Sequence, residues 1–393
     1  MANAASTNNF PLSIAMLCDS FGALGGVAQI VEDLAVEFSR AGHRVAIVSN
    51  PQKSAGIGRR RNPAVEQVWV DLPRAKPLYL RHPERLLRRR AAPELAGFIR
   101  RWAPDVLNIH GGLRDRFPAV LKAREQTRVP LVQSFHLVPE PSPEDARAAR
   151  LKSFTSMALR AAGAITFPSA AVKEGFRQIW PEAELARIIR GGVNLEEAAC
   201  ATPLSRQRPY IFSASRLDLR HKAVDALIEA FGMLAAEFPD VDLLIAGDGL
   251  QRTQIEEMIA ESGLEARIRL LSSLPHDELW SLYKSALFFV MLSRMAEGLP
   301  LVFFEAMACG TPVIGTRSGG TPEIVIHEET GLLVEGNEPD KVAAAMRTLL
   351  ASRDDRERMG RRGYELAKRY DWRAVASSYL EVYQDLLASE DRG

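Results

Sequence analysis

Two carboxylates eight residues apart, Glu297 and Glu305, stand in a part of the sequence that is otherwise almost wholly apolar. Glu297 lies in the short loop sequence MAEG after the apolar run LFFVML, and Glu305 lies inside the run LVFFEAMAC. The second run is typical of a short buried helix over 301–309, where an unpaired carboxylate is costly. A ligand with paired donors, such as a ribose diol, would offset that cost at Glu305. The alternative is that Glu305 points to solvent, although its neighbours leave little polar face.

Two cations follow another apolar run. Arg216 and Lys222 come directly after YIFSA (210–214), and a helix is expected to begin near Lys222. A cation pair at a strand end and a helix N-terminus suits a diphosphate, because free amides and the helix dipole favour anions there. The alternative is surface pairing with Asp218 or Asp225.

Backbone amides and glycines supply further candidate anion contacts. Pro300 suits a first helical turn, so the preceding loop and the turn would present free N–H groups to a phosphate. These amides belong to Gly298, Leu299, Leu301 and Val302. Gly247 ends the run LLIAGDG in a tight turn, a pattern that is common in parallel α/β folds.

Gly25 and Gly26 follow the first apolar run and open a helix. A dinucleotide-binding enzyme would place GxGxxG here and an acidic residue after the second strand. The glycine spacing differs, and the second strand ends in Ser49 and Asn50, so NAD is not favoured.

Two histidines complete the candidate site. His110 and His136 each follow an apolar run, VLNIH and VQSF, so we expect both rings to line a cleft and contact substrate. The alternative is that either ring is structural.

The elements that position these residues are short apolar strands that alternate with helices, the pattern of parallel sheets covered on both faces. The pattern lapses at 196–209, a polar stretch with two prolines, and then restarts. We therefore expect an α/β protein with two Rossmann-like, doubly wound domains facing across a cleft, over 1–200 and 206–370. The amphipathic end, 372–393, is expected to pack back on the first domain.

Bulk composition excludes several classes. The chain of 393 residues is 47% hydrophobic and 25% charged with a net charge of +1, so it is an ordinary globular protein with no expected nucleic-acid partner. Three scattered cysteines argue against a disulfide framework, and neither a secretory signal nor a membrane helix is evident. We expect a cytoplasmic location.

One segment departs from this even balance. Residues 53–101 hold thirteen Lys or Arg against four acidic residues, a local net charge of +9, mixed with apolar positions that include Leu95, Phe98 and Ile99. Such a segment can bind an anionic membrane or acceptor, at the inner membrane face for example. The alternative is a solvated helix face.

A metal site is not expected. Asp240-Val241-Asp242 reads DxD, but it precedes a strand and so lies at the end of the sheet away from the cleft. No Ser-His-Asp arrangement or GxSxG motif appears.

Taken together, the sequence resembles the retaining glycosyltransferases of family 4, which have the GT-B fold and a Glu-x7-Glu motif. The resemblance rests on GALGGVAQIVEDLAVEFSRAGHRVAIVS, SASRLDLRHKAVDALIEAF, LLIAGDG and, above all, AEGLPLVFFEAMACGTPVIGTRSGGTPEIV. It implies metal-independent transfer from a nucleotide-diphosphate sugar with retained anomeric configuration and no cofactor. UDP-sugar is the expected donor, with GDP-mannose second, and the acceptor cannot be read from the sequence.

The resemblance also implies roles for individual residues. Gly25 and Gly26 would approach the donor phosphates, Arg216 and Lys222 would hold the diphosphate, and Glu305 would bind the ribose. Glu297 would bind the sugar hydroxyls, and His136 matches the active-site histidine near the transferred sugar. His110 is then a candidate on the acceptor side.

Three departures from the family pattern are visible. One extra residue precedes Lys222, and Ala223 occupies the position of the usual glycine. This chain has GGVN where the family usually has NGVD, and EGLPL where the family usually has EGFGL. Alternative functions are a nucleotide-sugar epimerase or a sugar phosphorylase on the same fold, or a non-catalytic nucleotide-sugar-binding homologue.

Overall fold

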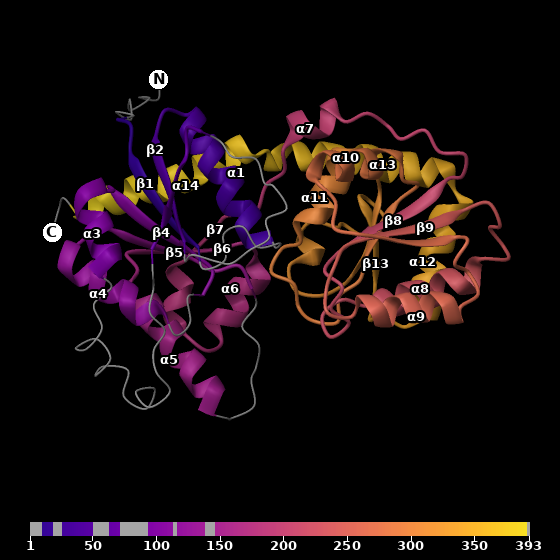
Figure 1. Ribbon diagram of the computed structural model, residues 1–393, viewed down its shortest axis with the longest axis horizontal. Coiled ribbons are helices and arrows are strands. Elements are labelled where there is room, and N and C mark those ends of the chain that lie inside the picture. The colour runs from indigo at the N-terminus through magenta and orange to yellow at the C-terminus, as the bar shows by residue number, and fades with distance from the viewer. Residues whose placement is uncertain are drawn as a thin grey trace, which may run out of the picture.

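The computed structural model of the chain describes residues 10–18, 26–49, 63–70, 93–112, 116–137 and 146–390. Within these ranges it contains two parallel β-sheets, each covered by helices (Figure 1). The predicted fold class, two Rossmann-like doubly wound domains, is confirmed. Gly25 and most of the basic segment 53–101 lie outside the described residues.

The first sheet has the order β3-β2-β1-β4-β5-β6-β7, and every pair is parallel. Its central strands are buried on both faces, as the continuous apolar runs predict. The strands are β1 (Ser13–Cys18), β2 (Arg44–Ser49), β3 (Glu66–Trp69), β4 (Val106–His110), β5 (Leu131–Ser134), β6 (Ala164–Phe167) and β7 (Arg187–Ile188). The helices of this half are α1 (Gly26–Arg40), α3 (Pro93–Trp102), α4 (Phe117–Thr127), α5 (Ala146–Ala161), α6 (Ala170–Arg177) and the short 3₁₀ helix η3 (Pro181–Leu185).

The second sheet has the order β10-β9-β8-β11-β12-β13 and is also parallel. Its strands are β8 (Tyr210–Ala214), β9 (Asp242–Ala246), β10 (Ile268–Leu271), β11 (Phe289–Met291), β12 (Val313–Thr316) and β13 (Gly331–Val334). The helices of this half are α7 (Leu195–Cys200), α8 (Val224–Leu234), α9 (Arg252–Glu261), α10 (His276–Ser285), α11 (Leu301–Ala308), η4 (Thr321–Glu323), α12 (Pro339–Ala351), α13 (Arg353–Ala367) and η5 (Lys368–Tyr370).

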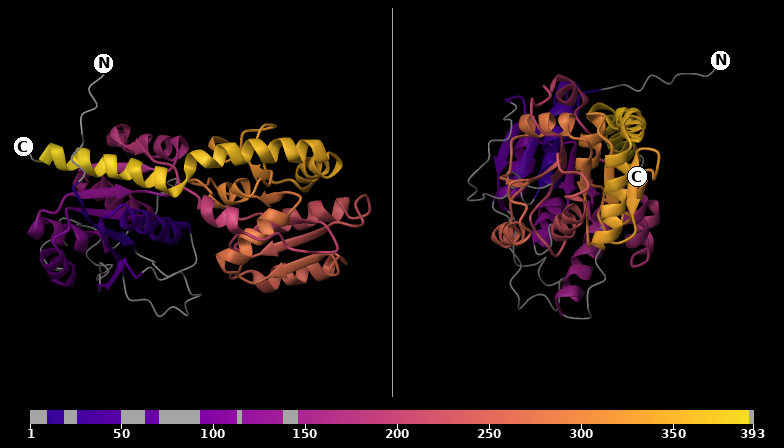
Figure 2. Two further views of the ribbon diagram at one scale, coloured as in Figure 1. Left: turned by 90° about the horizontal axis from the view of Figure 1, so that it is seen from above. Right: turned by 90° about the vertical axis from the view of Figure 1, so that its right-hand side faces the viewer.

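The last helix, α14 (Trp372–Glu390), returns to the first half of the chain. Figure 2 shows the C-terminal helices running along one side of both halves, and α14 contacts α1. The buried Tyr383 hydroxyl of α14 accepts a hydrogen bond from Asn108 Nδ2 on β4 at 2.7 Å. The apolar core is continuous between the two halves, because Val193, Leu301 and Trp372 belong to one buried cluster.

The structure refines two local expectations. The alternation of strands and helices lapses over 196–209, but the first residues of this stretch form α7, which packs on α10 and α11. The helix after β8 begins at Val224 rather than at Lys222, because residues 218–222 form a tight turn in which Asp218 O accepts the N–H groups of His221 and Lys222.

Within the basic segment 53–101 the structure describes residues 63–70, which include β3, and residues 93–101, which belong to helix α3. Its apolar residues Leu95, Phe98 and Ile99 are buried in the core of the first half. The apolar face of α3 is therefore not available to insert into a membrane. None of the helices in the described ranges combines the length and apolar character needed to cross a bilayer.

Candidate active site

The two sheets have topological switch points that bring the candidate residues together. In the second sheet the chain runs outward from β8 to β10 and then restarts at β11, which lies beside β8. Open parallel sheets bind ligands outside the carboxyl ends of the two strands at such a point. The segment with Arg216 and Lys222 follows β8, and the loop with Glu297 follows β11, so both occupy the switch point.

Glu297 is held by an ion pair with Lys222. Lys222 Nζ lies 2.5 Å from Glu297 Oε1, and the Ser293 hydroxyl donates to the same oxygen at 2.6 Å. Burial opposes the charged form of Glu297, but the charge and hydrogen bond of Lys222, with help from Ser293 and Arg216, outweigh it and lower the pKa of the carboxyl. Glu297 is therefore an ionised acceptor at neutral pH.

The extra residue before Lys222 is absorbed by the turn at Asp218. The Asp218 carboxylate accepts from the Arg220 amide at 3.2 Å and contacts His221 Nδ1 at 2.8 Å. Lys222 then forms an isolated bridge with Ser293 and reaches Glu297. The insertion thus leaves the cation beside the carboxylate.

Arg216 is exposed, and its guanidinium hydrogen-bonds to none of the described residues. Its backbone is fixed by the neighbouring glycine turn: a Cβ on Gly247, which has φ +148°, would lie 1.9 Å from Ser215 O. Gly247 therefore serves to pack the turn after β9 against the loop that carries Arg216. Gly247 thus contacts the backbone of Ser215, the residue directly before Arg216.

Glu305 is 3% exposed, so the alternative that it points to solvent is wrong. Gln29 Nε2 of α1 donates to Oε1 at 2.9 Å, and the Tyr283 hydroxyl of α10 donates to Oε2 at 2.9 Å. His276 Nε2 lies 3.4 Å from Oε1. Burial and then the Glu305 charge raise the pKa of Tyr283 well above its ordinary value, so its hydroxyl remains a donor. The buried Glu305 carboxylate therefore accepts hydrogen bonds from both halves of the chain, from Gln29 in the first and from Tyr283 in the second.

The loop of Glu297 touches the first half through glycines. A Cβ on Gly298 would lie 1.9 Å from His136 O, and the Ser169 hydroxyl donates to Gly298 O at 2.8 Å. On its other side, Gly319 has φ +55° and would place a Cβ 2.1 Å from Glu297 O. Only residues without a Cβ allow the backbone to approach so closely on both sides of this loop.

The first turn of α11 follows this loop. Pro300 is the N-cap residue of α11, so the free amides of the helix start at Leu301 and Val302. Leu299 and Leu301 are buried, and Leu301 packs so closely on Gly191 that a Cβ there would lie 2.4 Å from its Cδ2. Their side chains therefore anchor the turn, and their backbone remains the group that can meet an anion.

Gly26 opens α1, and a Cβ there would meet nothing within 4 Å. Packing within the described residues thus gives no reason for a glycine, in contrast to Gly298.

The two histidines lie together after the neighbouring strands β4 and β5. His110 Nδ1 is 3.2 Å from His136 Nε2, and the rings are stacked with centroids 5.3 Å apart. His110 is 1% exposed, so the expectation that its ring lines the cleft is wrong: Tyr379 of α14 and His136 cover it. Burial lowers the pKa of His136 to about 4, and burial and then His136 lower the pKa of His110.

The DxD sequence is held by cations of its own domain. Asp242 begins β9, is buried, and accepts from Arg208 Nε at 2.9 Å. No cluster of three or more His, Cys, Asp or Glu suited to a metal occurs within the described residues.

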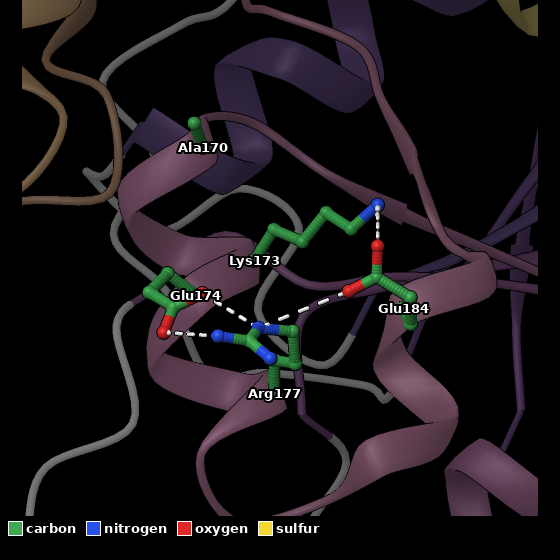
Figure 3. A pocket seen from close by; sticks show the side chains of 5 residues that line it. All are labelled: Ala170, Lys173, Glu174, Arg177 and Glu184. Atoms are coloured by element: carbon green, nitrogen blue, oxygen red, sulfur yellow. Dashed lines mark hydrogen bonds and ion pairs between the residues drawn. The ribbon is translucent and has the colours of Figure 1, made fainter.

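A surface hollow of about 480 Å³ is lined by residues of α6 and η3, and none of the predicted site residues lines it (Figure 3). Its charged side chains pair with one another: Arg177 Nε lies 2.7 Å from Glu174 Oε2, and Lys173 Nζ lies 3.9 Å from Glu184 Oε1. It is a set of surface ion pairs and adds nothing to the site.

Several contact residues were missed from the sequence. The pair Gly319-Gly320 was a visible signal, since two glycines after a strand indicate a close backbone approach. Gln29 and Ser169 gave no signal, because their roles depend on contact between segments far apart in the chain.

Comparison with known proteins agrees with this architecture. Residues 24–197 match the model of Glycosyltransferase Family 4, and residues 196–366 match that of Glycosyl transferases group 1. Together the two matches extend over residues 24–366.

Among curated relatives, D-inositol 3-phosphate glycosyltransferase of Corynebacterium glutamicum is 37% identical over 176 residues, covering 43% of this chain and 42% of that protein. The GDP-mannose-dependent alpha-(1-6)-phosphatidylinositol monomannoside mannosyltransferase of Mycolicibacterium smegmatis is 34% identical over 182 residues, covering 44% of this chain and 47% of that protein. The matched segment therefore spans less than half the length of these relatives.

Solved structures extend the likeness over the whole fold. Sucrose-phosphate synthase from Thermosynechococcus elongatus has a TM-score of 0.76 at 22% identity, covering 96% of this chain and 100% of that chain. HepE from Anabaena in complex with UDP has a TM-score of 0.75 at 20% identity, covering 95% and 100%. The fold is GT-B.

Proposed function

We propose that this protein is a retaining, metal-independent glycosyltransferase that moves a sugar from a nucleotide-diphosphate sugar to an acceptor. The observation that carries the proposal is the Lys222–Glu297 ion pair beside the exposed Arg216 at the switch point of the second sheet. A paired carboxylate in the loop that leads into α11, and near it a guanidinium without a hydrogen-bond partner among the described residues, suit a sugar attached to a diphosphate.

In the proposed reaction the cations act on the leaving group. Negative charge develops on the nucleotide diphosphate as the bond to the sugar breaks, and Arg216 and Lys222 would stabilise it together with the α11 amides.

The carboxylates would position the donor. Glu297, ionised and tied to Lys222, can accept hydrogen bonds from sugar hydroxyls. Glu305 would bind the ribose once the amide of Gln29 leaves Oε1, since that oxygen already accepts from it. His136, whose carbonyl touches the Gly298 backbone, would lie beside the transferred sugar.

We propose a UDP-sugar as donor and GDP-mannose as the second candidate. HepE, described above, was solved with UDP, and the relative from Mycolicibacterium smegmatis is named as GDP-mannose-dependent, which supports both candidates.

A nucleotide screen by thermal shift tests donor binding, because a ligand stabilises the folded state in proportion to ln(1 + [L]/Kd). UDP or GDP should raise the melting temperature of the wild type, and Arg216→Ala should abolish that rise. Arg353→Ala is the matched control, since Arg353 is an exposed cation paired with Glu357 on α13. No shift with any nucleotide would refute the proposal.

Incubation with nucleotide sugars then separates the alternatives. Free nucleotide together with a glycosylated acceptor supports the transferase. An epimerised donor would indicate an epimerase, sugar 1-phosphate formed with added phosphate would indicate a phosphorylase, and binding without turnover would indicate a non-catalytic homologue.

We also propose that the basic segment 53–101 attracts an anionic acceptor or membrane surface. With Leu95, Phe98 and Ile99 in the core, that attraction would be electrostatic and therefore screened by salt. Co-sedimentation with vesicles that contain anionic lipid should fall as salt rises, and equal partitioning with neutral vesicles would refute the idea.

A further inference from the structure

The rings of His110 and His136 are in contact with each other, and the number of protons that the pair carries follows from its surroundings. His110 ends β4, where its register partner on β5 is Ser134, so His136 stands two residues beyond that partner. The ring nitrogens His110 Nδ1 and His136 Nε2 are 3.2 Å apart. Burial keeps both rings neutral near pH 7 because it lowers both pKa values, so each ring carries one N–H.

The other two ring nitrogens lack partners. His110 Nε2 and His136 Nδ1 are buried and hydrogen-bond to none of the described residues. One proton occupies the link between the rings, so one of these two nitrogens bears an N–H and the other a lone pair.

The surroundings distinguish the two arrangements. His110 is 1% exposed and is covered by Tyr379, with ring centroids 5.9 Å apart, whereas His136 is partly exposed. A buried N–H without an acceptor is rarer in proteins than a buried acceptor without a donor. The arrangement that avoids an orphaned N–H on His110 has His110 Nδ1–H donating to His136 Nε2. The free N–H then lies on His136 Nδ1, an atom that is itself covered but belongs to the partly exposed ring of the pair.

We propose that His110 is a positioning residue, which holds His136 in the Nδ1–H form so that a neutral N–H meets a hydroxyl oxygen of the transferred sugar once the bound donor has displaced the groups that cover Nδ1. This inference rests on the proposed function. A neutral donor can fix the sugar without adding charge beside the reacting carbon, whereas the other tautomer would present only a lone pair.

The ring of His110 is itself fixed by its neighbours. Asn108, on the same strand, donates to Tyr383, and the Ser134 hydroxyl donates to Asn108 Oδ1 at 3.0 Å. This buried polar network ties the end of β4 to α14 beside Tyr379. A rotation of the His110 ring itself would break its contact with His136 and change its packing on Tyr379.

Two amide substitutions at one position provide the test. His110→Asn places its amide near the position of Nδ1 and can still donate to His136, whereas His110→Gln places its amide near Nε2 and cannot. Both variants keep a polar side chain, so a merely structural role would affect them alike. The ring tautomer of His136 is read from ¹⁵N spectra of histidine-labelled protein, with His136→Gln used to assign its signals.

The expected result is a proton on His136 Nδ1 in the wild type and in His110→Asn, and a shift toward Nε2 in His110→Gln. With the best donor of the nucleotide-sugar screen, kcat should fall about tenfold in His110→Gln and stay within about threefold in His110→Asn, with the donor KM changed less than about twofold in both. Equal kcat values in the two variants would overturn the proposal.

The spectra and the donor screen are separate readouts. A wild type that carries the expected tautomer and turns over no nucleotide sugar refutes the proposed function. An active wild type with the His136 proton on Nε2 refutes the role of His110.

Discussion

A methyl group added at Gly298 should push the loop of Glu297 away from His136 in the first half of the chain. The Cβ of Gly298→Ala would lie 1.9 Å from His136 O and 2.9 Å from its carbonyl carbon, whereas real Cβ contacts essentially never fall below 3.0 Å. The obstacle is backbone, which cannot swing aside. The loop of Glu297 must therefore move by about 1 Å or more away from His136, and the hydrogen bond from Ser169 to Gly298 O is strained.

A displacement of about 1 Å in a catalytic group can cost about 100-fold in rate. We therefore expect kcat/KM of Gly298→Ala to fall about 100-fold. Overpacking should also lower the free energy of unfolding by about 1–3 kcal/mol. Binding of the free nucleotide should change much less, since Arg216 and Glu305 lie outside the displaced loop.

Steady-state kinetics, nucleotide titration and urea unfolding measure these three quantities. Gly232→Ala is the control, because a Cβ in that helical position makes only an ordinary contact, 3.9 Å from Leu264 Cδ1. It should keep full activity and gain slightly in stability. A kcat/KM for Gly298→Ala within about threefold of wild type would show that the close approach of the two halves is not part of the active state.

Three further predictions concern buried polar groups. Tyr283→Phe removes a donor to Glu305 and should lower the free energy of unfolding by about 1–3 kcal/mol, measured in urea; an unchanged value would contradict the role of that hydrogen bond. Gln29→Ala frees Glu305 Oε1 for a ribose and should tighten UDP binding in calorimetry, and weaker binding would argue against the exchange. His110 and His136 stay neutral below the ordinary pKa of 6.5, where the unfolded chain gains protons, so stability should fall from pH 6.5 toward about 4 by about 1.4 kcal/mol per pH unit for each histidine. Unfolding titrations at several pH values check this, and His136→Gln should reduce the slope.

The fold was predictable because each element carries its own signal. Strand β8 and helix α8 are read from apolar runs and helical spacing, and the order of strands and helices fixes a parallel sheet. The switch-point rule then places Arg216, Lys222 and Glu297 together without any knowledge of tertiary contacts. These residues belong to loops directly after strands, where the sequence determines position well.

The partners of the buried groups were not predictable, because they arise where distant segments meet. Gln29 contacts Glu305 across 276 positions of the chain. The burial of His110 depends on α14 folding back over β4, which brings Tyr379 to the ring. No local pattern in VLNIH distinguishes a histidine that lines a cleft from one that a later helix covers.

The contacts at Glu297 and Arg216 indicate that the proposed diphosphate and sugar subsites are built differently. One lies on the second domain, and the other lies at the interface between the two domains. Arg216 and Lys222, the cations proposed to hold the diphosphate, both lie on the second domain. Glu297 is different, because its loop is pressed between Gly319 of its own domain and the His136 backbone of the other. The proposed sugar subsite therefore takes its shape where the halves meet, and we expect nucleotide binding and sugar binding to respond to different substitutions.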